Sequence, residues 1–417
     1  MNIVSIINNK KNKIELSEIE INYFIKEFTI NKTIPDYQAA ALLMAFNING
    51  LTDDEIFFLT KYMIEYSNKL EFKKTNLIID KHSSGGVGDK VSLIITPILR
   101  SLGFSIAKLS GRGLGLTGGT IDKLDSIKAN TFYKNNNDIM KQFNENQIIF
   151  LQQTDDIVPA DKIIYALRDV TGTVDTDGLI ISSILSKKFI INSDYIFLDI
   201  KIGDGALIKT KEHGNIIANK MQIVAKKFNR NLKIKLTDMN KPLGRAIGNK
   251  LEIIETIEFL KNKNVAIDLK DNIYEFIISV LLETKITSSK EEAIKMIDNV
   301  LNDNSAYLEF TKWINSISEV NVDKIIDDYN PKNSIEIKSS KSGTIDYNDI
   351  EKIALVNLEL GAGRKNKDSK IDFDAGIYLN KKSGNKVEKN DIIATLYSDK
   401  IISENLIEIF NNSYEIK

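Results

Sequence analysis

Two short apolar runs early in the chain each end in a glycine-rich loop, and each loop leads into a helical pattern. The run "NLIID" at 76–80 is followed by "KHSSGGVGDK" at 81–90, and "FSIAKLS" at 104–110 is followed by "GRGLGLTGGT" at 111–120. A strand that ends in such a loop and is followed by a helix is the repeating unit of parallel sheets. Two successive units therefore predict a parallel α/β architecture.

Helical patterns lie on both sides of this region. Ser17 with Glu20, and Thr52 with Glu55, form capping-box signatures, which mark the start of a helix. Helical text returns at about 160–190. No strand pattern interrupts the first of these stretches. Since both stretches are helical, they are expected to build one helical lobe from separate segments of the chain.

The length of 417 residues predicts more than one domain. The expected fold class is α/β and α+β: a helical lobe, a large α/β lobe with a central mixed sheet, and a smaller C-terminal α+β domain. A shift to short β-like pieces near residue 330 sets the last boundary. The expected parts are 1–67 with about 160–190, 76–159 with 191–329, and 330–417.

The composition excludes several classes of protein. Lys plus Arg number 56 and Asp plus Glu number 57, so the formal net charge of -1 gives no broad basic surface for nucleic acid. The chain has no cysteine, which excludes disulfides and thiolate metal sites and suits a reducing cytoplasm. It shows no apolar run of membrane-spanning length and no signal-peptide pattern at residue 1. We expect a cytoplasmic protein without membrane or nucleic-acid partners.

The two glycine-rich loops predict an anion site. A helix N-terminus presents unpaired N–H groups and partial positive charge, and both loops would lie at the carboxyl edge of a parallel sheet. One loop alone is a weak signal, since it can be a turn with solvated hydroxyls. Two loops beside a lysine favour phosphate. The candidate phosphate ligands are Lys81, Ser83, Ser92, Ser110 and Thr120.

A second set of polar residues lies in the later helical stretch. Ser183 and Lys187 are four residues apart and therefore share one helix face, and Arg168 lies on the preceding helix. These groups could converge on a planar polar ligand such as a nucleobase. The alternative is that Arg168 and Lys187 are ordinary solvated helix charges.

Five segments in order along the chain resemble the thymidine phosphorylase and pyrimidine-nucleoside phosphorylase family. They are "DKHSSGGVGDKVSL", "SGRGLGLTGGTIDKLDSI", "YALRDVTGTVD", "MNKPLGRAIGN" and "GAGRKNKDSKIDFDAGI". The resemblance implies a homodimer that uses phosphate to split uridine, deoxyuridine or thymidine into the free base and an α-(deoxy)ribose 1-phosphate. It implies no organic cofactor.

The resemblance also implies roles for the candidate residues. Those named above as phosphate ligands keep that role, while the base would be held by His82, Arg168, Ser183 and Lys187. His82, Arg168 and Lys187 would be catalytic, because the departing pyrimidine gains negative charge that cations and a proton donor stabilise. The other histidine, His213, is interpreted as a surface residue.

A monovalent cation is the remaining implication of the resemblance. Enzymes of this kind can hold K⁺ through groups that match Gly88, Leu243, Ala246 and Glu255, but Lys90 stands where a threonine ligand would be. An ammonium group cannot coordinate a cation. Either Lys90 points into water and the ion binds with one ligand fewer, or the Lys90 ammonium takes the ion's place and pairs with Glu255.

The chain departs from the family pattern at several positions. Leu116 replaces a histidine in the second loop, and Asp177 with Gly178 replaces a more apolar turn. Asp204 and Leu207 stand where serine and phenylalanine are common. The loss of an aromatic side chain at 207 predicts broad pyrimidine specificity.

Two other functions remain open. A phosphoribosyltransferase of the anthranilate type resembles this family in fold, but it must hold a diphosphate, usually through Mg²⁺ and a carboxylate pair. We see no such acidic pair beside the loops. A non-catalytic interaction protein is the second alternative, and the set Lys81, His82, Arg168 and Lys187 argues against it.

Overall fold

The computed structural model describes residues 1–113, 118–133, 135–152, 157–364 and 369–417. Its internal contacts divide the chain into two compact units. Unit 1 consists of Met1–Asp80, Gln153–Ile196 and Asn215–Ile234, and unit 2 consists of Lys81–Gln152, Phe197–Gly214 and Lys235–Lys417. The finer division into three parts stays a prediction.

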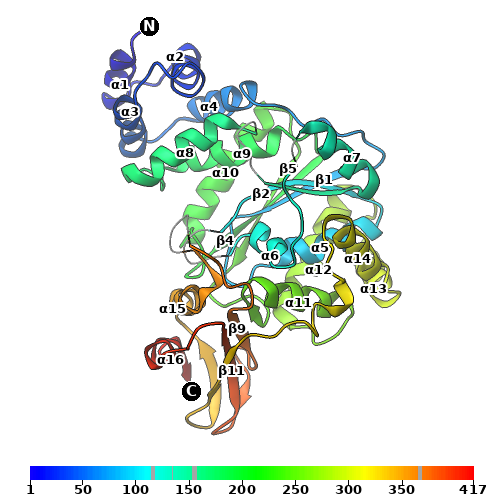
Figure 1. Cartoon of the computed structure of the whole chain (residues 1–417). Coiled ribbons are helices and arrows are strands. Elements are labelled where there is room, and N and C mark those ends of the chain that lie inside the picture. The colour runs from blue at the N-terminus through cyan, green and yellow to red at the C-terminus, as the bar shows by residue number, and fades with distance from the viewer. Residues whose placement is uncertain (114–117, 134, 153–156, 365–368) are drawn as a thin grey trace. The chain divides into compact units, whose positions relative to one another are not determined.

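Unit 1 is mainly helical (Figure 1, blue and green). Both predicted capping boxes are present: Ser17 and Thr52 each accept the N–H of the glutamate three residues on, and each glutamate accepts the cap's own N–H. The helices are α1 (Ile3–Lys11), α2 (Glu18–Ile25) with a π-helical turn (Lys26–Ile30), α3 (Asp36–Asn49), α4 (Asp53–Glu65), α8 (Pro159–Thr171), α9 (Asp177–Phe189) and most of α10 (Lys211–Lys227).

The central sheet has the strand order β3-β2-β1-β4-β5. Its strands are β1 (Ile78–Ser83), β2 (Ser105–Ser110), β3 (Ile148–Gln152), β4 (Tyr195–Ile202) and β5 (Leu232–Asp238). Strands β2 and β3 pair in parallel, with Ile106 opposite Ile148. The sheet is parallel, so the predicted mixed sheet was wrong in this detail. Each successive strand is reached through one or more helices, and such a crossover returns the chain in the same direction.

Unit 2 contains the helices that follow the two glycine-rich loops and several further helices. These are α5 (Val91–Ser101), α6 (Thr120–Asp125), α7 (Asn136–Asn146), α11 (Asn249–Leu260), α12 (Ile267–Glu283), α13 (Lys290–Asn302) and α14 (Ser305–Ile317), followed by a 3₁₀ turn (Val322–Lys324). Helix α5 continues through Pro97, which lies inside the helix. Helix α11 packs against both α5 and α6, the helices that follow the two loops.

The C-terminal part of unit 2 is built on antiparallel sheets, as expected for an α+β domain (Figure 1, orange and red). Its elements are β7 (Asn333–Lys338), β8 (Gly343–Tyr347), α15 (Ile350–Asn357) with a π-helical turn (Leu358–Ala362), β9 (Gly376–Leu379), β10 (Lys386–Val387), β11 (Ile392–Ser398), α16 (Glu404–Asn411) and β12 (Tyr414–Ile416). The short strand β6 (Ala246–Ile247) joins β9, β11 and β7 in one sheet. This pairing ties the segment before α11 to the C-terminal domain.

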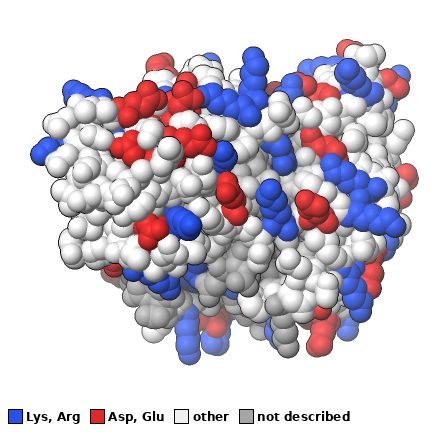
Figure 2. Space-filling model, turned by 90° about the horizontal axis from the view of Figure 1, so that it is seen from above, with Lys and Arg blue, Asp and Glu red and all other residues white. Residues whose placement is uncertain are grey.

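Acidic and basic side chains are interspersed on the face of the molecule drawn in Figure 2. None of the helices in the described part of the chain combines the length and the apolar character that crossing a bilayer requires.

Candidate active site

The first glycine-rich loop connects β1 to α5 and is held by its own polar groups. Ser83, the last residue of β1, donates to the carboxylate of Asp89, and the Gly85 N–H donates to the Ser83 hydroxyl at 3.2 Å. The Asp89 carboxylate also accepts the N–H of Val91, the first residue of α5, at 3.2 Å. Ser83 therefore shapes the loop, and its hydroxyl donor is used by Asp89.

Lys81 lies in β1 at the edge of this loop, and its side chain is only 3% exposed. Its ammonium lies 3.8 Å from the carboxylate of Asp199 on β4, while Lys201 makes the shorter contact with that carboxylate, at 2.7 Å. Burial lowers the pKa of Lys81, against the opposing effects of Asp89 and Asp199. Burial alone would raise the pKa of Asp89, but Lys81 and Lys201 outweigh it and hold that pKa well below its usual range.

The described ends of the second loop carry the other predicted hydroxyls. Ser110 ends β2 and Thr120 begins α6. Ser92, in the first turn of α5, accepts a hydrogen bond from the buried Lys108 ammonium at 3.1 Å. The structure thus places Ser92 and Ser110 on neighbouring elements of unit 2, while Leu116 lies outside the described residues.

The two histidines lie in different elements. His82 lies between Lys81 and Ser83 in β1 and is partly buried. His213 lies in the first turn of α10, where its N–H donates to the Thr210 hydroxyl at 3.2 Å. The exposure of the His213 side chain is also intermediate.

Three of the four predicted base-binding residues, Arg168, Ser183 and Lys187, lie in unit 1, whereas His82 belongs to unit 2. Lys187 on α9 donates to the Ser183 hydroxyl at 2.7 Å and to the carboxylate of Asp161 on α8 at 2.5 Å. The first contact shows the shared helix face that the four-residue spacing predicts. Because Asp161 is buried and accepts from Lys187, it fixes the direction in which the ammonium points.

Arg168 on α8 is 1% exposed and donates to three backbone carbonyls. Its acceptors are the oxygens of Thr173 at 3.2 Å, Val174 at 2.5 Å and Leu179 at 3.4 Å. A guanidinium has five N–H groups, so these contacts orient it without using all of its donors. Burial lowers its pKa, and the charge of Asp161 opposes that shift. Neither Arg168 nor Lys187 is an ordinary solvated helix charge.

Sequence reasoning missed several charged groups that lie beside the predicted phosphate and base residues. The missed set is Asp89, Lys108, Lys123, Asp161, Asp199 and Lys201. Two of its lysines lie in strands with a mainly apolar centre, "SIAKLS" and "YIFLDIKI". A charge in such a strand is rarely buried without a partner, so that pattern was an available signal.

Two departures from the family pattern have a structural setting. Gly178, in the first turn of α9, packs on Leu51, where an added Cβ would lie 2.5 Å from the leucine Cδ1. Asp177 begins that helix, a position where a negative charge is favourable. Leu207 is 65% exposed and lines a hollow of about 280 Å³, along with Asp204 and with Val87 of the first loop.

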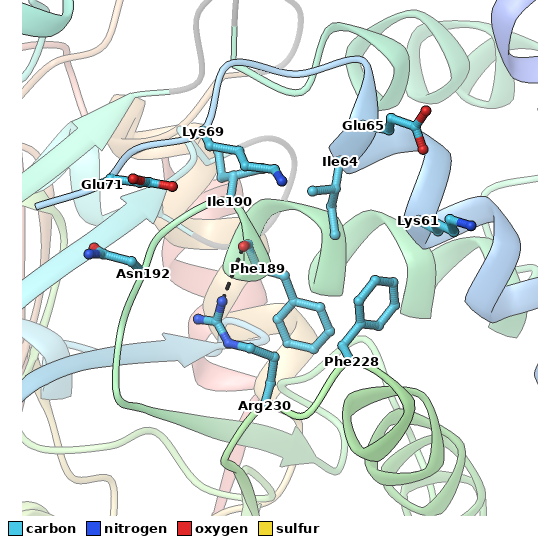
Figure 3. Close-up of a pocket in the computed structure, with 10 residues that line it drawn as sticks. All are labelled: Lys61, Ile64, Glu65, Lys69, Glu71, Phe189, Ile190, Asn192, Phe228 and Arg230. Atoms are coloured by element: carbon cyan, nitrogen blue, oxygen red, sulfur yellow. Dashed lines mark hydrogen bonds between the residues drawn. The ribbon is translucent and has the colours of Figure 1, made fainter.

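Figure 3 shows a separate hollow of about 380 Å³ in unit 1. Phe189 and Phe228 form part of its wall, and Arg230 donates to the Phe189 carbonyl at 3.2 Å. Arg230 also bonds to the carbonyls of Ile191 and Ser193. The guanidinium therefore holds this backbone in place, and no predicted site residue lines the hollow.

The chain matches three family models in succession. The helical bundle domain of a glycosyl transferase family covers residues 4–67, and its a/b domain covers 75–307. The pyrimidine nucleoside phosphorylase C-terminal domain covers residues 344–417. The chain belongs to the thymidine and pyrimidine-nucleoside phosphorylase family. This assignment confirms the family resemblance that the glycine-rich loops indicated.

Full-length relatives of the family agree with this assignment. A thymidine phosphorylase from Mycoplasmoides pirum is 49% identical over 98% of both chains. A pyrimidine-nucleoside phosphorylase from Staphylococcus haemolyticus is 38% identical over 100% of this chain and 96% of its own.

Solved structures of anthranilate phosphoribosyltransferases share the fold at low identity. The enzyme from Saccharomyces cerevisiae, in complex with PRPP and Mg, gives a TM-score of 0.60 at 14% identity, over 76% of this chain and 98% of its own. The enzyme from Thermus thermophilus gives 0.57 at 15% identity, over 75% and 98%. At such identity the likeness shows the fold alone.

Proposed function

We propose that this protein catalyses the phosphorolysis of pyrimidine nucleosides. The bond between the sugar C1′ and the base N1 breaks, and its electron pair leaves with the base, which takes up a proton. A phosphate oxygen forms the new bond to C1′. The products are the free pyrimidine and an α-(deoxy)ribose 1-phosphate, so inorganic phosphate is a co-substrate and no organic cofactor is needed.

The Lys81 ammonium is the single observation that carries this proposal. It is buried, it has no hydrogen-bond partner among the described residues, and its carboxylate neighbour lies 3.8 Å away. A buried donor without an acceptor is costly, and an incoming anion would remove that cost. Ser110 and Thr120 lie in the same unit and offer hydroxyl donors that phosphate takes, whereas the Ser83 hydroxyl donates to Asp89.

The base-binding residues would act on the leaving group. As the glycosidic bond breaks, negative charge grows on the pyrimidine oxygens. The Arg168 and Lys187 cations are fixed by their contacts before the reaction begins, and such prior orientation is the main source of electrostatic catalysis. His82 would donate a hydrogen bond or a proton to a base oxygen.

The test is uracil release from uridine with and without phosphate. Release that requires phosphate is expected, and release without it, or none from any pyrimidine nucleoside, would refute the proposal. Incubation of uracil with phosphoribosyl diphosphate and Mg²⁺ tests the phosphoribosyltransferase alternative. An Arg168→Ala protein that releases uracil at the normal rate would favour a different base site.

We also propose that the protein is a homodimer through the helical unit. Helices α1, α3 and α8 lie together in Figure 1, and α3 packs against both of the others. Tyr37, Ile48 and Val170 on these helices are exposed apolar side chains that gain by burial against a second copy. Analytical ultracentrifugation should give a dimer, and Ile48→Asp with Val170→Asp should give a monomer. The chain's lack of cysteine accords with a cytoplasmic location.

A further inference from the structure

The Lys90 ammonium is enclosed by oxygen atoms of the segment that precedes α11 and of α11 itself. Its side chain is 0% exposed. It donates to the Leu243 carbonyl at 3.0 Å, the Ala246 carbonyl at 2.9 Å and the Glu255 carboxylate at 2.5 Å. An ammonium has three N–H donors, so all of them are used.

The Glu255 carboxylate, one of the three acceptors of Lys90, is itself held by the backbone of the preceding turn. The Glu255 carboxylate also accepts the backbone N–H of Arg245 at 2.7 Å and of Ala246 at 2.8 Å. The Lys90 N–H donates to the Gly88 carbonyl at 3.0 Å. One side chain thus joins the first glycine-rich loop, the 243–246 turn and helix α11.

The backbone leaves little room around this ammonium. Gly244 has φ +69°, and an added Cβ there would lie 2.8 Å from the Lys90 nitrogen and 2.7 Å from Glu255. Gly88 has φ +77°, and its added Cβ would lie 2.5 Å from the Leu243 carbonyl oxygen. The two glycines permit the close approach of the loop and the turn that brings the oxygens together.

These contacts do not fit a K⁺ ion at the same place. Two carbonyls and a carboxylate are cation ligands, but here the Lys90 nitrogen already stands within 3.0 Å of all three. A second ammonium group, that of Lys382, donates to the Gly244 carbonyl of the same turn and pairs with Asp268 at 2.9 Å. The charges of Lys90 and Lys382 thus balance those of the two carboxylates. A further cation would be repelled by both ammonium groups. The buried position also excludes the reading in which Lys90 points into water.

We propose that Lys90 is a built-in replacement for the monovalent cation that the family resemblance implies. The covalent ammonium would hold the first glycine-rich loop against α11 at any salt composition. The protein should therefore need no K⁺ for activity or for stability, and removal of the ammonium should create a need for an exchangeable cation. The activity readout rests on the proposed phosphorolysis, whereas a melting temperature does not.

The test compares the unmutated protein with Lys90→Thr and Lys90→Met in tetramethylammonium chloride and in KCl at equal ionic strength. For the unmutated protein, the rate of uracil release and the melting temperature should be the same in both salts. In tetramethylammonium, Lys90→Thr should melt several degrees lower and lose roughly tenfold to a hundredfold in rate, as a displacement of about 1 Å can cause. KCl should restore part of both losses.

Lys90→Met is the matched control, because its side chain fills the space and offers no oxygen to a cation. It should melt lower in both salts and gain nothing from KCl. In crystals of Lys90→Thr soaked with Tl⁺, anomalous density should appear between Leu243, Ala246 and Glu255. A K⁺ effect on the unmutated protein would overturn the proposal without any variant, and so would a folded Lys90→Thr that gains nothing from K⁺.

Discussion

Removal of the Arg364 side chain should weaken phosphate binding from a distance. Arg364, in the C-terminal part of unit 2, donates to the carboxylate of Asp122 at 2.7 Å. That carboxylate, on α6, also accepts the N–H groups of Gly113 at 2.6 Å and Gly119 at 3.2 Å. Asp122 therefore closes the two described ends of the second glycine-rich loop, and Arg364 holds Asp122 in place.

The size of the effect follows from burial. The Asp122 side chain is 2% exposed and that of Arg364 is 14% exposed. Removal of one partner from a fully buried pair costs about 3–5 kcal/mol. Arg112, 3.6 Å from Asp122 and 44% exposed, offers partial compensation. We expect Arg364→Ala to lower the free energy of unfolding by about 2 kcal/mol, since water reaches the remaining carboxylate more easily than in a closed core.

The kinetic effect should be specific to phosphate. If misplacement of the loop weakens the binding free energy of phosphate by about 1.4 kcal/mol, the KM for phosphate should rise about tenfold. The KM for uridine should change little, because three of the four proposed base contacts, Arg168, Ser183 and Lys187, lie in unit 1. The assay is the initial rate of uracil release over a phosphate series, with urea unfolding to confirm that the variant is folded.

Two control variants separate this role from a general structural one. Arg364→Lys keeps the positive charge, so its phosphate KM should rise less than that of Arg364→Ala. Arg112→Ala removes the exposed neighbour and should change the phosphate KM less than Arg364→Ala does. The reasoning is refuted if folded Arg364→Ala protein keeps its phosphate KM, or if the uridine KM rises equally.

Three further predictions concern single residues. His82→Ala should lower kcat while phosphate affinity, measured by protection against thermal unfolding, stays nearly intact; an unchanged kcat would eliminate His82 as a catalytic group. Leu207→Phe should make the enzyme more selective among uridine, deoxyuridine and thymidine, as measured by the ratios of kcat/KM. Asp89 has a lowered pKa, so its stabilising effect is present above its unfolded pKa of about 3.9 and fades as the pH falls. The difference in unfolding free energy between the unmutated protein and Asp89→Asn should therefore shrink from pH 7 to pH 3, and a constant difference would contradict the assignment.

The sequence predicted the elements well where local chemistry decides them. The capping boxes at Ser17 and Thr52 act through neighbours three residues away, and both are present. Strand β2 ends where its predicted loop begins, because glycine residues stop the apolar pattern. Strand β1 instead continues to Ser83, three residues into the segment predicted as loop. The four-residue spacing of Ser183 and Lys187 likewise produced a direct contact.

Contacts between distant segments were beyond the same reasoning. Arg364 and Asp122 are separated by 242 positions, and nothing in the spacing of either residue indicates the other. The two residues of β6 are too few to form a recognisable strand pattern, although their pairing with β9 ties the 243–247 segment to the C-terminal sheet.

The loop "KHSSGGVGDK" shows most clearly what the structure adds. Its two lysines are equivalent in composition arguments, since each supplies one positive charge beside glycines. Lys90 has three acceptors for its three donors, and a saturated buried ammonium has no N–H left for a ligand. Lys81 is equally buried, but its ammonium lies 3.8 Å from the Asp199 carboxylate, which is closer to Lys201, at 2.7 Å.

The number of acceptors thus divides the lysines of this region into two kinds. Lys123 belongs with Lys90: it contacts the Asp89 carbonyl at 3.0 Å, the Gly118 carbonyl at 3.3 Å and the Glu252 carboxylate at 3.1 Å. These two lysines hold both glycine-rich loops to α11, so the cost of burying them is met by fixed protein oxygens. The cost of burying Lys81 is not met in this way. An anion at the loops would supply the missing acceptor, and for that reason we assign phosphate to Lys81 and a scaffold role to Lys90.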